Sequence, residues 1–408
     1  MTRIIEFLIA LGIVAGLFVV VGLVLPSERQ MSESVETNRR MTIVYDTVNS
    51  FRRFKDWNPL VLRDPKIQLK LAGPEEGKGA RVEYSSTEGY IGNGSWEITN
   101  SVKNERVEIA IEDPTKGYDK VTNFTLVPTG KNNKNVKITQ DYSVKYGWNL
   151  FGRYAGLYVS RHVGDDLKLG LSRLATVLAT VPNFDYRAEL DGKPVLSDLK
   201  IVDVPAEDLL VVTAGNIDRD NETIKKSIKD NQEWIKRVMD SNGLEAAGPV
   251  RIVTTDFASD KYAFDVVQPV RKRAGGAPKT DAKADTAKAD AKKADAKKAD
   301  AKKADAKKNG SAAAAPVDAT PVAATGDELK LNIPSEAPVK YQRVPAHRSA
   351  FATYAGHMAG LDAVRNSLRA WAATSGMDVT DRPYEAWKGG VDKSFTQDGT
   401  YDVYWAIK

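Results

Sequence analysis

The C-terminal part of the chain repeats itself, and this repetition limits its fold more than any other feature. Five short landmarks recur at offsets of 133 to 141 residues: 204–206 and 344–346, 213–215 and 354–356, 233–234 and 370–371, 241–244 and 374–377, and 264–267 and 401–404. The second copy predicts a strand over 347–354, an amphipathic helix over 361–373, and strands over 384–387 and 401–407. Because one such unit cannot bury its apolar face alone, we expect the two copies to pair around a pseudo-twofold axis.

The second copy also carries a series of motifs in a fixed order. Residues 344–357 read V-P-A-x-x-x-A-x-x-x-Y-A-G-H, a helix with Trp371 and the pair Ser375-Gly376 follow, and residues 382–387 read R-P-Y-E-x-W. These residues resemble the GyrI-like effector-binding domain, which also follows the DNA-binding domains of AraC- and MerR-type regulators. The resemblance predicts such a domain over 197–408 and implies a cleft that binds lipophilic cations or other small aromatic molecules. Since no helix-turn-helix accompanies it, the regulator role does not transfer.

The resemblance implies which residues would form this cleft. Glu385 matches the acidic position of the family's P-x-E-x-Y pattern, and Trp387 replaces the tyrosine, which keeps a π face and loses a hydroxyl. The candidate ligand-binding residues are Glu385, Tyr384, Trp387, Tyr401, Trp405 and Tyr354. A desolvated carboxylate ringed by aromatic side chains favours a flat cation. In the alternative reading Glu385 is solvated and the aromatics are sheet core, and in a third Glu385 and Tyr354 are the catalytic pair of a hydrolase.

The N-terminal segment is long and apolar. Residues 4–25 contain one charge, Glu6, and as a helix they would extend about 33 Å, enough to cross a hydrocarbon core of roughly 30 Å. A cleaved signal peptide is the alternative, although its apolar region is shorter and small residues follow it. We expect residues 1–26 to anchor the protein in a bacterial inner membrane by a single pass. Large domains often translocate despite flanking positive charges, so we expect the periplasmic side, although the positive-inside rule favours the cytoplasm.

Residues 35–180 predict an α+β domain. Alternating apolar and β-branched residues indicate strands over 81–85, 94–99, 106–111, 121–127 and 136–144. Leucines at 167, 171, 174 and 178 form the apolar stripe of a long C-terminal helix, and Gly164-Asp165-Asp166 resemble its N-terminus. We expect an antiparallel sheet with this helix lying across it. His162, near the start of the helix, is interpreted as structural, with a catalytic role as the alternative.

Short motifs in this domain resemble the START-like (SRPBCC) domains of the polyketide cyclase/dehydrase type. They are the F-x-x-W-x-P segment within 48–59, glycines at 73, 77 and 79, and Gly92-Asn93-Gly94. The resemblance implies a helix-grip fold with a deep apolar cavity between sheet and helix. The candidate lining residues are Trp57, Tyr84, Tyr90 and Trp96, which ordinary core packing would equally explain. The acid and base residues of the enzymatic members have no matched set here.

A Lys/Ala/Asp-rich insert over 271–337 separates the two copies. Residues 279–308 hold 11 Lys and 6 Asp, which accounts for the net charge of +5 of the whole chain. The remaining residues are therefore neutral in sum, and we expect no specific nucleic-acid partner. The insert is interpreted as a solvated spacer, and weak contact of 279–308 with anionic surfaces is the alternative.

Catalytic motifs are absent from the sequence. There is no cysteine, only three histidines, no phosphate-binding loop and no nucleophile elbow, so we expect neither a metal nor another cofactor. The sequence favours a membrane-anchored protein that senses, sequesters or carries small lipophilic molecules, one cavity per domain. A hydrolase or cyclase acting on a small hydrophobic substrate and a structural envelope protein that uses the basic spacer are the alternatives.

Overall fold

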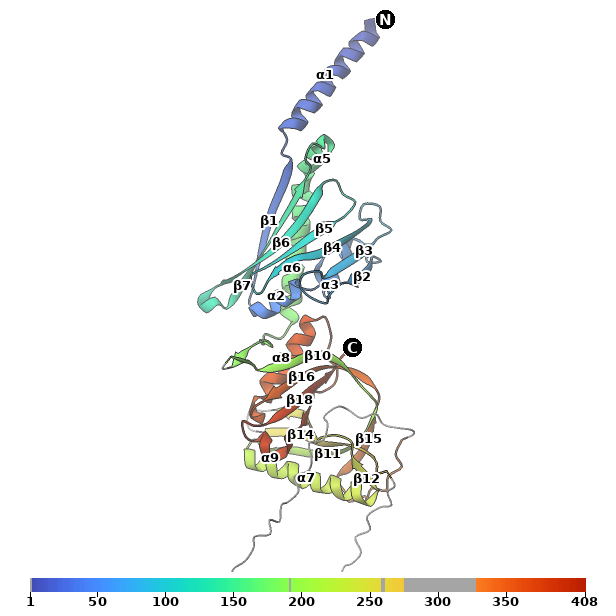
Figure 1. Ribbon diagram of the computed structural model, residues 1–408, viewed down its shortest axis with the longest axis vertical. Helices are drawn as coiled ribbons and strands as arrows, with labels where there is room; N and C mark the ends of the chain where they lie inside the picture. The colour runs from blue at the N-terminus through green and yellow to red at the C-terminus, as the bar shows by residue number, and fades with distance from the viewer. Residues whose placement is uncertain (1, 191, 258–260, 275–327) are drawn as a thin grey trace, which may run out of the picture. The chain divides into compact units, whose positions relative to one another are not determined.

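The computed structural model describes residues 2–190, 192–257, 261–274 and 328–408 (Figure 1). The Lys/Ala/Asp repeat at 279–308 lies outside the described residues. By the proximity of Cα atoms the chain divides into two compact units, Met1–Leu199 with Leu361–Thr380 and Ile407–Lys408, and Lys200–Gly360 with Asp381–Ala406. The helix of the second sequence copy, 361–374, is thus grouped with the first unit, and the predicted domain boundaries stay predictions.

The first element is one apolar helix, α1 (Thr2–Val24). Most of its large side chains are exposed. It is long and apolar enough to cross a membrane, and a signal sequence has the same properties. This confirms the expected N-terminal apolar helix.

The first unit contains a seven-stranded antiparallel sheet in the order β1-β7-β6-β5-β4-β3-β2 (Figure 1). The strands are β1 (Glu28–Thr37), β2 (Gln68–Ala72), β3 (Arg81–Ser85), β4 (Asn93–Val102), β5 (Arg106–Glu112), β6 (Tyr118–Thr129) and β7 (Asn135–Lys145). All five predicted strands are present. The sheet is larger than predicted, since β1 begins directly after the apolar helix and pairs with β7 from Glu28 to Thr37.

Helices complete the α+β arrangement of this unit. They are α2 (Met41–Val48), α3 (Phe54–Trp57), α4 (Pro59–Arg63), η1 (Lys131–Asn133), α5 (Leu150–Ala155), η2 (Gly156–Tyr158) and α6 (Val159–Thr180), and β8 (Glu189–Leu190) with β9 (Lys193–Pro194) forms a small hairpin after them. The predicted leucine stripe of α6 is buried. The predicted N-terminus of this helix is wrong: α6 begins at Val159, so Asp165 and Asp166 lie inside it.

The second sheet confirms the expected pairing of two copies. Its order is β10-β16-β18-β17-β13-β14-β11-β15, and β12 pairs with β14. The strands are β10 (Leu196–Val204), β11 (Glu207–Asp218), β12 (Leu244–Ala246), β13 (Arg251–Phe257), β14 (Lys261–Lys272), β15 (Val339–Val344), β16 (His347–Ala355), β17 (Tyr384–Trp387) and β18 (Thr400–Ala406). The two copies meet where β17 pairs with β13. Counting outward from there, β18 corresponds to β14, β16 to β11 and β10 to β15, so the order is that of a pseudo-twofold pair.

The helices that follow these strands match the sequence pattern. They are α7 (Asn221–Ser241), η3 (Met358–Gly360), α8 (Leu361–Thr374) and α9 (Gly390–Ser394). The side chain of Asp220 accepts a hydrogen bond from the Thr223 N–H and so caps α7. The isoleucines at 224, 228 and 235 are buried on one side of this helix.

Candidate functional site

A cavity of about 220 Å³ lies between α6 and the seven-stranded sheet. Its lining comes from the α3–α4 segment, from strands β3 to β7 and from the first half of α6. The lining residues used below are Trp57, Arg63, Tyr84, Tyr90, Trp96, Asp113, Thr115, Thr122, Gln140, Tyr142, His162, Asp166 and Leu167. All four aromatic residues predicted to line a cavity in this domain are among them.

The aromatic side chains of the lining are also part of the hydrophobic core. Trp57 and Tyr84 are buried, and Trp96 is half-buried. The rings of Trp57 and Trp96 meet edge to face at 6.4 Å, and Trp57 meets Phe124 in the same way at 5.8 Å. Tyr90 is exposed and stands at the rim. Trp57 and Tyr84 thus border the cavity and also belong to the core, whereas Tyr90 borders the cavity without being core.

Two glycine positions of the family-like motifs have a steric reason here. A Cβ atom at Gly94 would lie 2.3 Å from the Tyr84 hydroxyl and 2.2 Å from the Glu112 carbonyl oxygen. Gly73 has a positive φ of 73°, and its Cβ would lie 2.2 Å from the Gly79 carbonyl oxygen. Gly94 thus makes room for the ring that forms one wall of the cavity.

Polar groups on β6 and β7 interrupt the apolar lining. The Gln140 amide donates to the Thr122 hydroxyl over 3.1 Å, and Thr122 donates to the Asp141 carbonyl over 3.0 Å. Burial raises the pKa of the Tyr84 and Tyr142 phenols well above the usual value, with a smaller effect of Asp113 in the same direction. Both phenols therefore stay neutral and offer a hydroxyl rather than a charge.

The charged residues of the lining are paired with protein groups. Arg63 of α4 forms an ion pair with Asp166 of α6. Burial raises the pKa of Asp166, and the Arg63 charge opposes this rise. Lys120 is buried and donates to the Asp113 carboxylate over 2.5 Å and to the Thr115 carbonyl over 2.7 Å.

The sequence motifs do not indicate the polar lining residues Thr122 and Gln140. Thr122 and Gln140 are buried two residues from Phe124 and Ile138, so they share the inward face of their strands with these apolar residues. A polar residue at an inward position of an otherwise apolar strand was the available signal. His162 lies in the first turn of α6, where its side chain is exposed and borders the cavity.

A second candidate site surrounds Glu385 on β17. This side chain is fully buried, and it shares its face of the sheet with Trp387. The register places Tyr401 opposite Trp387 and Tyr354 opposite Tyr401. The Trp387 and Tyr401 rings meet edge to face at 5.7 Å, and Tyr354 stacks on Tyr401 at 5.6 Å. The structure therefore brings these four predicted residues to one face.

The same face is closed by the segment that follows β17. The Tyr401 hydroxyl donates to the Ser394 carbonyl over 2.9 Å, and Phe395 meets the Trp387 ring at 6.0 Å. Burial raises the pKa of Tyr401 to about 12. The Tyr354 hydroxyl donates to the His357 carbonyl over 3.2 Å. In this arrangement the aromatic residues pack as core around the carboxylate.

Two predicted residues lie apart from this group. Tyr384 precedes Glu385 in the strand, so its side chain is on the opposite face. There it stacks on Tyr404 at 4.8 Å and lies 4.7 Å from the Arg251 guanidinium. Trp405 shares the face of Glu385 but stands near the end of β18, where its indole N–H donates to the Asp381 carbonyl over 3.2 Å. Of the five candidate aromatic residues, Trp387, Tyr401 and Tyr354 therefore form one group near Glu385, and Tyr384 and Trp405 lie outside it.

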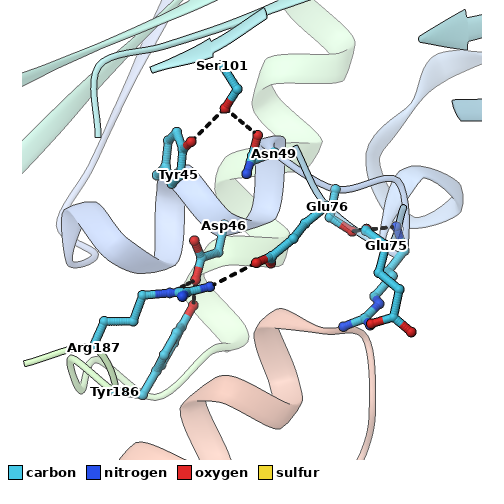
Figure 2. A network of polar contacts seen from close by, with 10 residues as sticks. Tyr45, Asp46, Asn49, Glu75, Glu76, Ser101, Tyr186 and Arg187 are labelled. Atoms are coloured by element: carbon cyan, nitrogen blue, oxygen red, sulfur yellow. Dashed lines mark hydrogen bonds and ion pairs between the residues drawn. The ribbon is translucent and has the colours of Figure 1, made fainter. Parts of the chain in front are cut away.

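A polar network at one end of α2 has a structural role (Figure 2). The buried Asp46 carboxylate accepts from Arg187 Nε over 2.8 Å and from the Tyr186 hydroxyl over 2.9 Å, and Arg187 also reaches Glu76 at 3.4 Å. Burial raises the pKa of Asp46, which the Arg187 charge counteracts. Ser101 bonds Asn49 at 2.6 Å in the same region. The network ties the chain after α6 to α2.

Comparison with known proteins finds likeness of fold in parts of the chain. No protein family and no curated protein matches the sequence. Among solved structures, XoxI from Bacillus cereus is 10% identical, with 37% of this chain and 96% of that chain covered and a TM-score of 0.29. Norcoclaurine synthase from Thalictrum flavum, in complex with dopamine and hydroxybenzaldehyde, is 11% identical, with 39% and 91% covered and a TM-score of 0.30. The C-terminal domain of EcmrR is 11% identical, with 52% and 97% covered and a TM-score of 0.32.

Proposed function

We propose that this protein binds a small, uncharged, mostly apolar molecule in the cavity between α6 and the seven-stranded sheet, while α1 holds it in a membrane. The observation that carries the proposal is the cavity itself, an apolar and aromatic lining with a few converging hydroxyl and amide groups. This combination is typical of small-molecule sites. At about 220 Å³ the cavity is smaller than the roughly 300 Å³ and more of drug-sized sites, so the ligand is small.

The charges around the cavity support an uncharged ligand. Arg63 is paired with Asp166, and Lys120 is paired with Asp113. Lys120 is buried, so a charged ligand that displaced its Asp113 partner would leave a buried charge unpaired, which is strongly unfavourable. The neutral phenols of Tyr84 and Tyr142 and the Gln140 amide suit a hydroxyl or carbonyl group on the ligand.

A thermal-shift screen of the full chain in detergent micelles tests this proposal. A ligand at 100 times its dissociation constant adds about 2.7 kcal/mol to the stability of the unit that binds it. Leu167→Phe fills the cavity and is expected to abolish the stabilisation. Leu169→Phe is the matched control, because Leu169 lies on the same helix and is exposed. Stabilisation that survives Leu167→Phe unchanged, or silence across a library of small neutral aromatics, refutes the proposal.

We extend the proposal to a lipophilic cation in the second unit. The support is a buried carboxylate, Glu385, beside the rings of Trp387 and Tyr401, since charge pairing and cation–π attraction favour a flat cation. Stabilisation by lipophilic cations is expected to vanish in Glu385→Gln, while ligands of the first cavity still stabilise that variant. If Glu385→Gln responds to cations like the parent chain, the second site does not exist.

The membrane side of the proposal follows from α1. We propose that α1 stays uncleaved and that both units lie on the periplasmic side of a bacterial inner membrane. The experiment is alkaline extraction of cell membranes followed by protease treatment of spheroplasts. Release of the chain by extraction overturns the anchor, and protection from protease overturns the periplasmic placement.

A further inference from the structure

Large apolar side chains crowd the surface beside the C-terminal end of α1. Trp148, Phe151, Leu157 and Tyr158 are 83%, 66%, 48% and 65% exposed, and we call these four residues the collar. They come from α5, from η2 and from the turn before α5. Contiguous exposed apolar groups of this size mark an interaction surface in a soluble domain.

Helix α5, which carries Phe151 of the collar, packs against the last two turns of α1. Phe18 stacks on Tyr154 at 4.5 Å and contacts Phe151 at 5.2 Å, and the Tyr154 hydroxyl donates to the Phe18 carbonyl over 2.8 Å. A Cβ at Gly22 would lie 3.2 Å from the Leu150 side chain, so a larger residue there would push α5 away. The collar is therefore continuous with the apolar surface of α1.

The Arg153 side chain joins α5 to the backbone of α1. Its Nη1 donates to the carbonyls of Leu23 and Leu25 over 3.0 and 3.2 Å. These carbonyls belong to the end of α1, where the helix itself leaves acceptors unpaired. The contact fixes α5 at the point where α1 would leave the hydrocarbon core.

The depth of these contacts can be worked out from helix geometry. Phe18 is six residues before Val24, which ends α1, so it lies about 9 Å inside the helix end. Interfacial helices bury their apolar face about 5–10 Å into a bilayer. The partners of Phe18 on α5 therefore reach the depth at which such helices lie.

The chemistry of the collar suits the boundary between water and lipid. Trp and Tyr are enriched at that boundary, and Lys and Arg place their apolar stems in it while the charge stays among the head groups. The Lys116 ammonium lies 5.7 Å from the Phe151 ring, and the Arg153 guanidinium lies 5.9 Å from the Trp148 ring. Lys116 thus places a cation beside this aromatic surface, whereas Arg153 is buried and donates to the carbonyls at the end of α1.

We propose that the collar is a membrane-binding surface that seats the first unit on the phospholipid bilayer crossed by α1. The inference rests on α1 spanning the membrane, which is part of the proposed function. Helix α6 starts directly after Tyr158, and its cavity-lining residues from His162 to Gly170 lie about 5–17 Å along its axis. Binding of the collar to the bilayer keeps the cavity close to the membrane, so the ligand of the cavity is one that partitions into the membrane.

The absence of cysteine from the chain allows a direct test. Single cysteines are placed at Phe151, Leu157, Leu17 and Val127 of the full chain and labelled with an environment-sensitive fluorophore. Each variant is reconstituted into vesicles of three parts phosphatidylcholine to one part phosphatidylglycerol, with or without lipids spin-labelled near the head group. Leu17 in α1 reports the span. Val127 is the matched control, because it is exposed on β6 but lies far from the collar. It is about 30 Å along the strand from Tyr118, whose hydroxyl is close to Gly147 beside the collar.

The spin-labelled lipids are expected to quench Phe151→Cys and Leu157→Cys at least half as strongly as Leu17→Cys, and to leave Val127→Cys unquenched. Quenching at Leu17 without quenching at the two collar positions overturns the seat while the span stands. No quenching at Leu17 overturns the span and the seat together. Collar labels shielded from both lipid quencher and aqueous iodide, to a degree that rises with protein per vesicle, identify a second copy as the occupant and also overturn the proposal.

Discussion

The buried ion pair between Arg251 and Glu207 tests how the duplicated sheet is held together. Nη1 and Nη2 of Arg251 donate to the two oxygens of Glu207 over 2.7 and 2.6 Å, and the side chains are only 5% and 3% exposed. Arg251 lies on β13 at the seam with β17, and the Tyr384 ring of β17 covers its guanidinium at 4.7 Å. The pair belongs to the first copy, and its aromatic neighbour belongs to the second.

Removing one partner is expected to be far more harmful than removing both. Glu207→Met leaves the Arg251 charge buried without a counter-ion, which costs about 3–5 kcal/mol. With a urea m-value of about 2 kcal/mol/M, the unfolding midpoint of this unit falls by about 1.5–2.5 M. Adding Arg251→Met to Glu207→Met removes the stranded charge, and replacing a whole buried pair by apolar residues is often neutral or stabilising. The double variant is therefore expected to be more stable than Glu207→Met.

The assay is hydrogen exchange of the full chain in micelles at increasing urea, followed in peptides from β13 and β14. A signal from the whole chain would mix the transitions of the two units. Asp218→Met is the control, because its pair with Lys261 is exposed and such pairs contribute about 0–1 kcal/mol. The reasoning is refuted if Glu207→Met lowers stability by no more than Asp218→Met, or if the double variant is less stable than Glu207→Met.

Three further predictions follow from the first unit and the insert. Gly94→Ala is expected to lower the melting temperature of that unit and to abolish ligand stabilisation, since its Cβ would strike the Tyr84 hydroxyl at 2.3 Å, whereas Gly89→Ala meets open space and changes neither. Burial raises the Asp166 pKa, so the stability that this residue contributes is full below its unfolded pKa near 3.8 and is lost as pH rises through the folded pKa. In denaturation series from pH 3 to 7, the free energy of unfolding of Asp166→Asn is therefore expected to rise relative to that of the parent chain as pH rises. An equal pH dependence of the two free energies would contradict this. Deletion of 279–308 is expected to leave the unfolding midpoints of both units and the stabilisation by ligand unchanged. A lower midpoint of either unit, or loss of the ligand stabilisation, supports a role for the basic repeat.

Side-chain alternation made most strands of the first sheet predictable, and the exceptions have physical reasons. β1 reads E-R-Q-M-S-E-S-V-E-T and is an edge strand that, among the described strands, pairs with β7 alone, so few of its residues need to be apolar. α6 starts without a side-chain cap at Tyr158, directly after η2, so no N-cap residue marks its beginning. The aspartates at 165 and 166 then resemble a start that lies nearly two turns too late.

Much of the candidate sites follows from one rule, that successive residues of a strand face opposite sides of the sheet. The aromatic lining of the first cavity follows from motif order, but Thr122 and Gln140 follow only from asking which strand positions point inward. The same rule separates Tyr384 from Glu385, because neighbours in a strand face opposite sides. A local sequence pattern does not show which residues pack against each face of a strand. Arg251, which contacts the Tyr384 ring, lies on the other copy of the repeat.

The order of the second sheet explains why an insert between the copies is tolerated. β10 precedes the first copy but pairs beside β16 of the second, and β15 precedes the second copy but pairs with β11 of the first. Each copy thus lends its leading strand to the other, and neither sheet half is complete alone. β14 and β15 both pair antiparallel with β11, Val270 opposite Asp208 and Val339 opposite Val212, so their facing ends are about 10 Å apart across the sheet and about 13 Å apart along β11. Halving the length of such a connection changes its closure free energy by only about 0.6 kcal/mol. Because the exchanged strands hold the copies together, we expect the length and charge of the insert to have little effect on the fold.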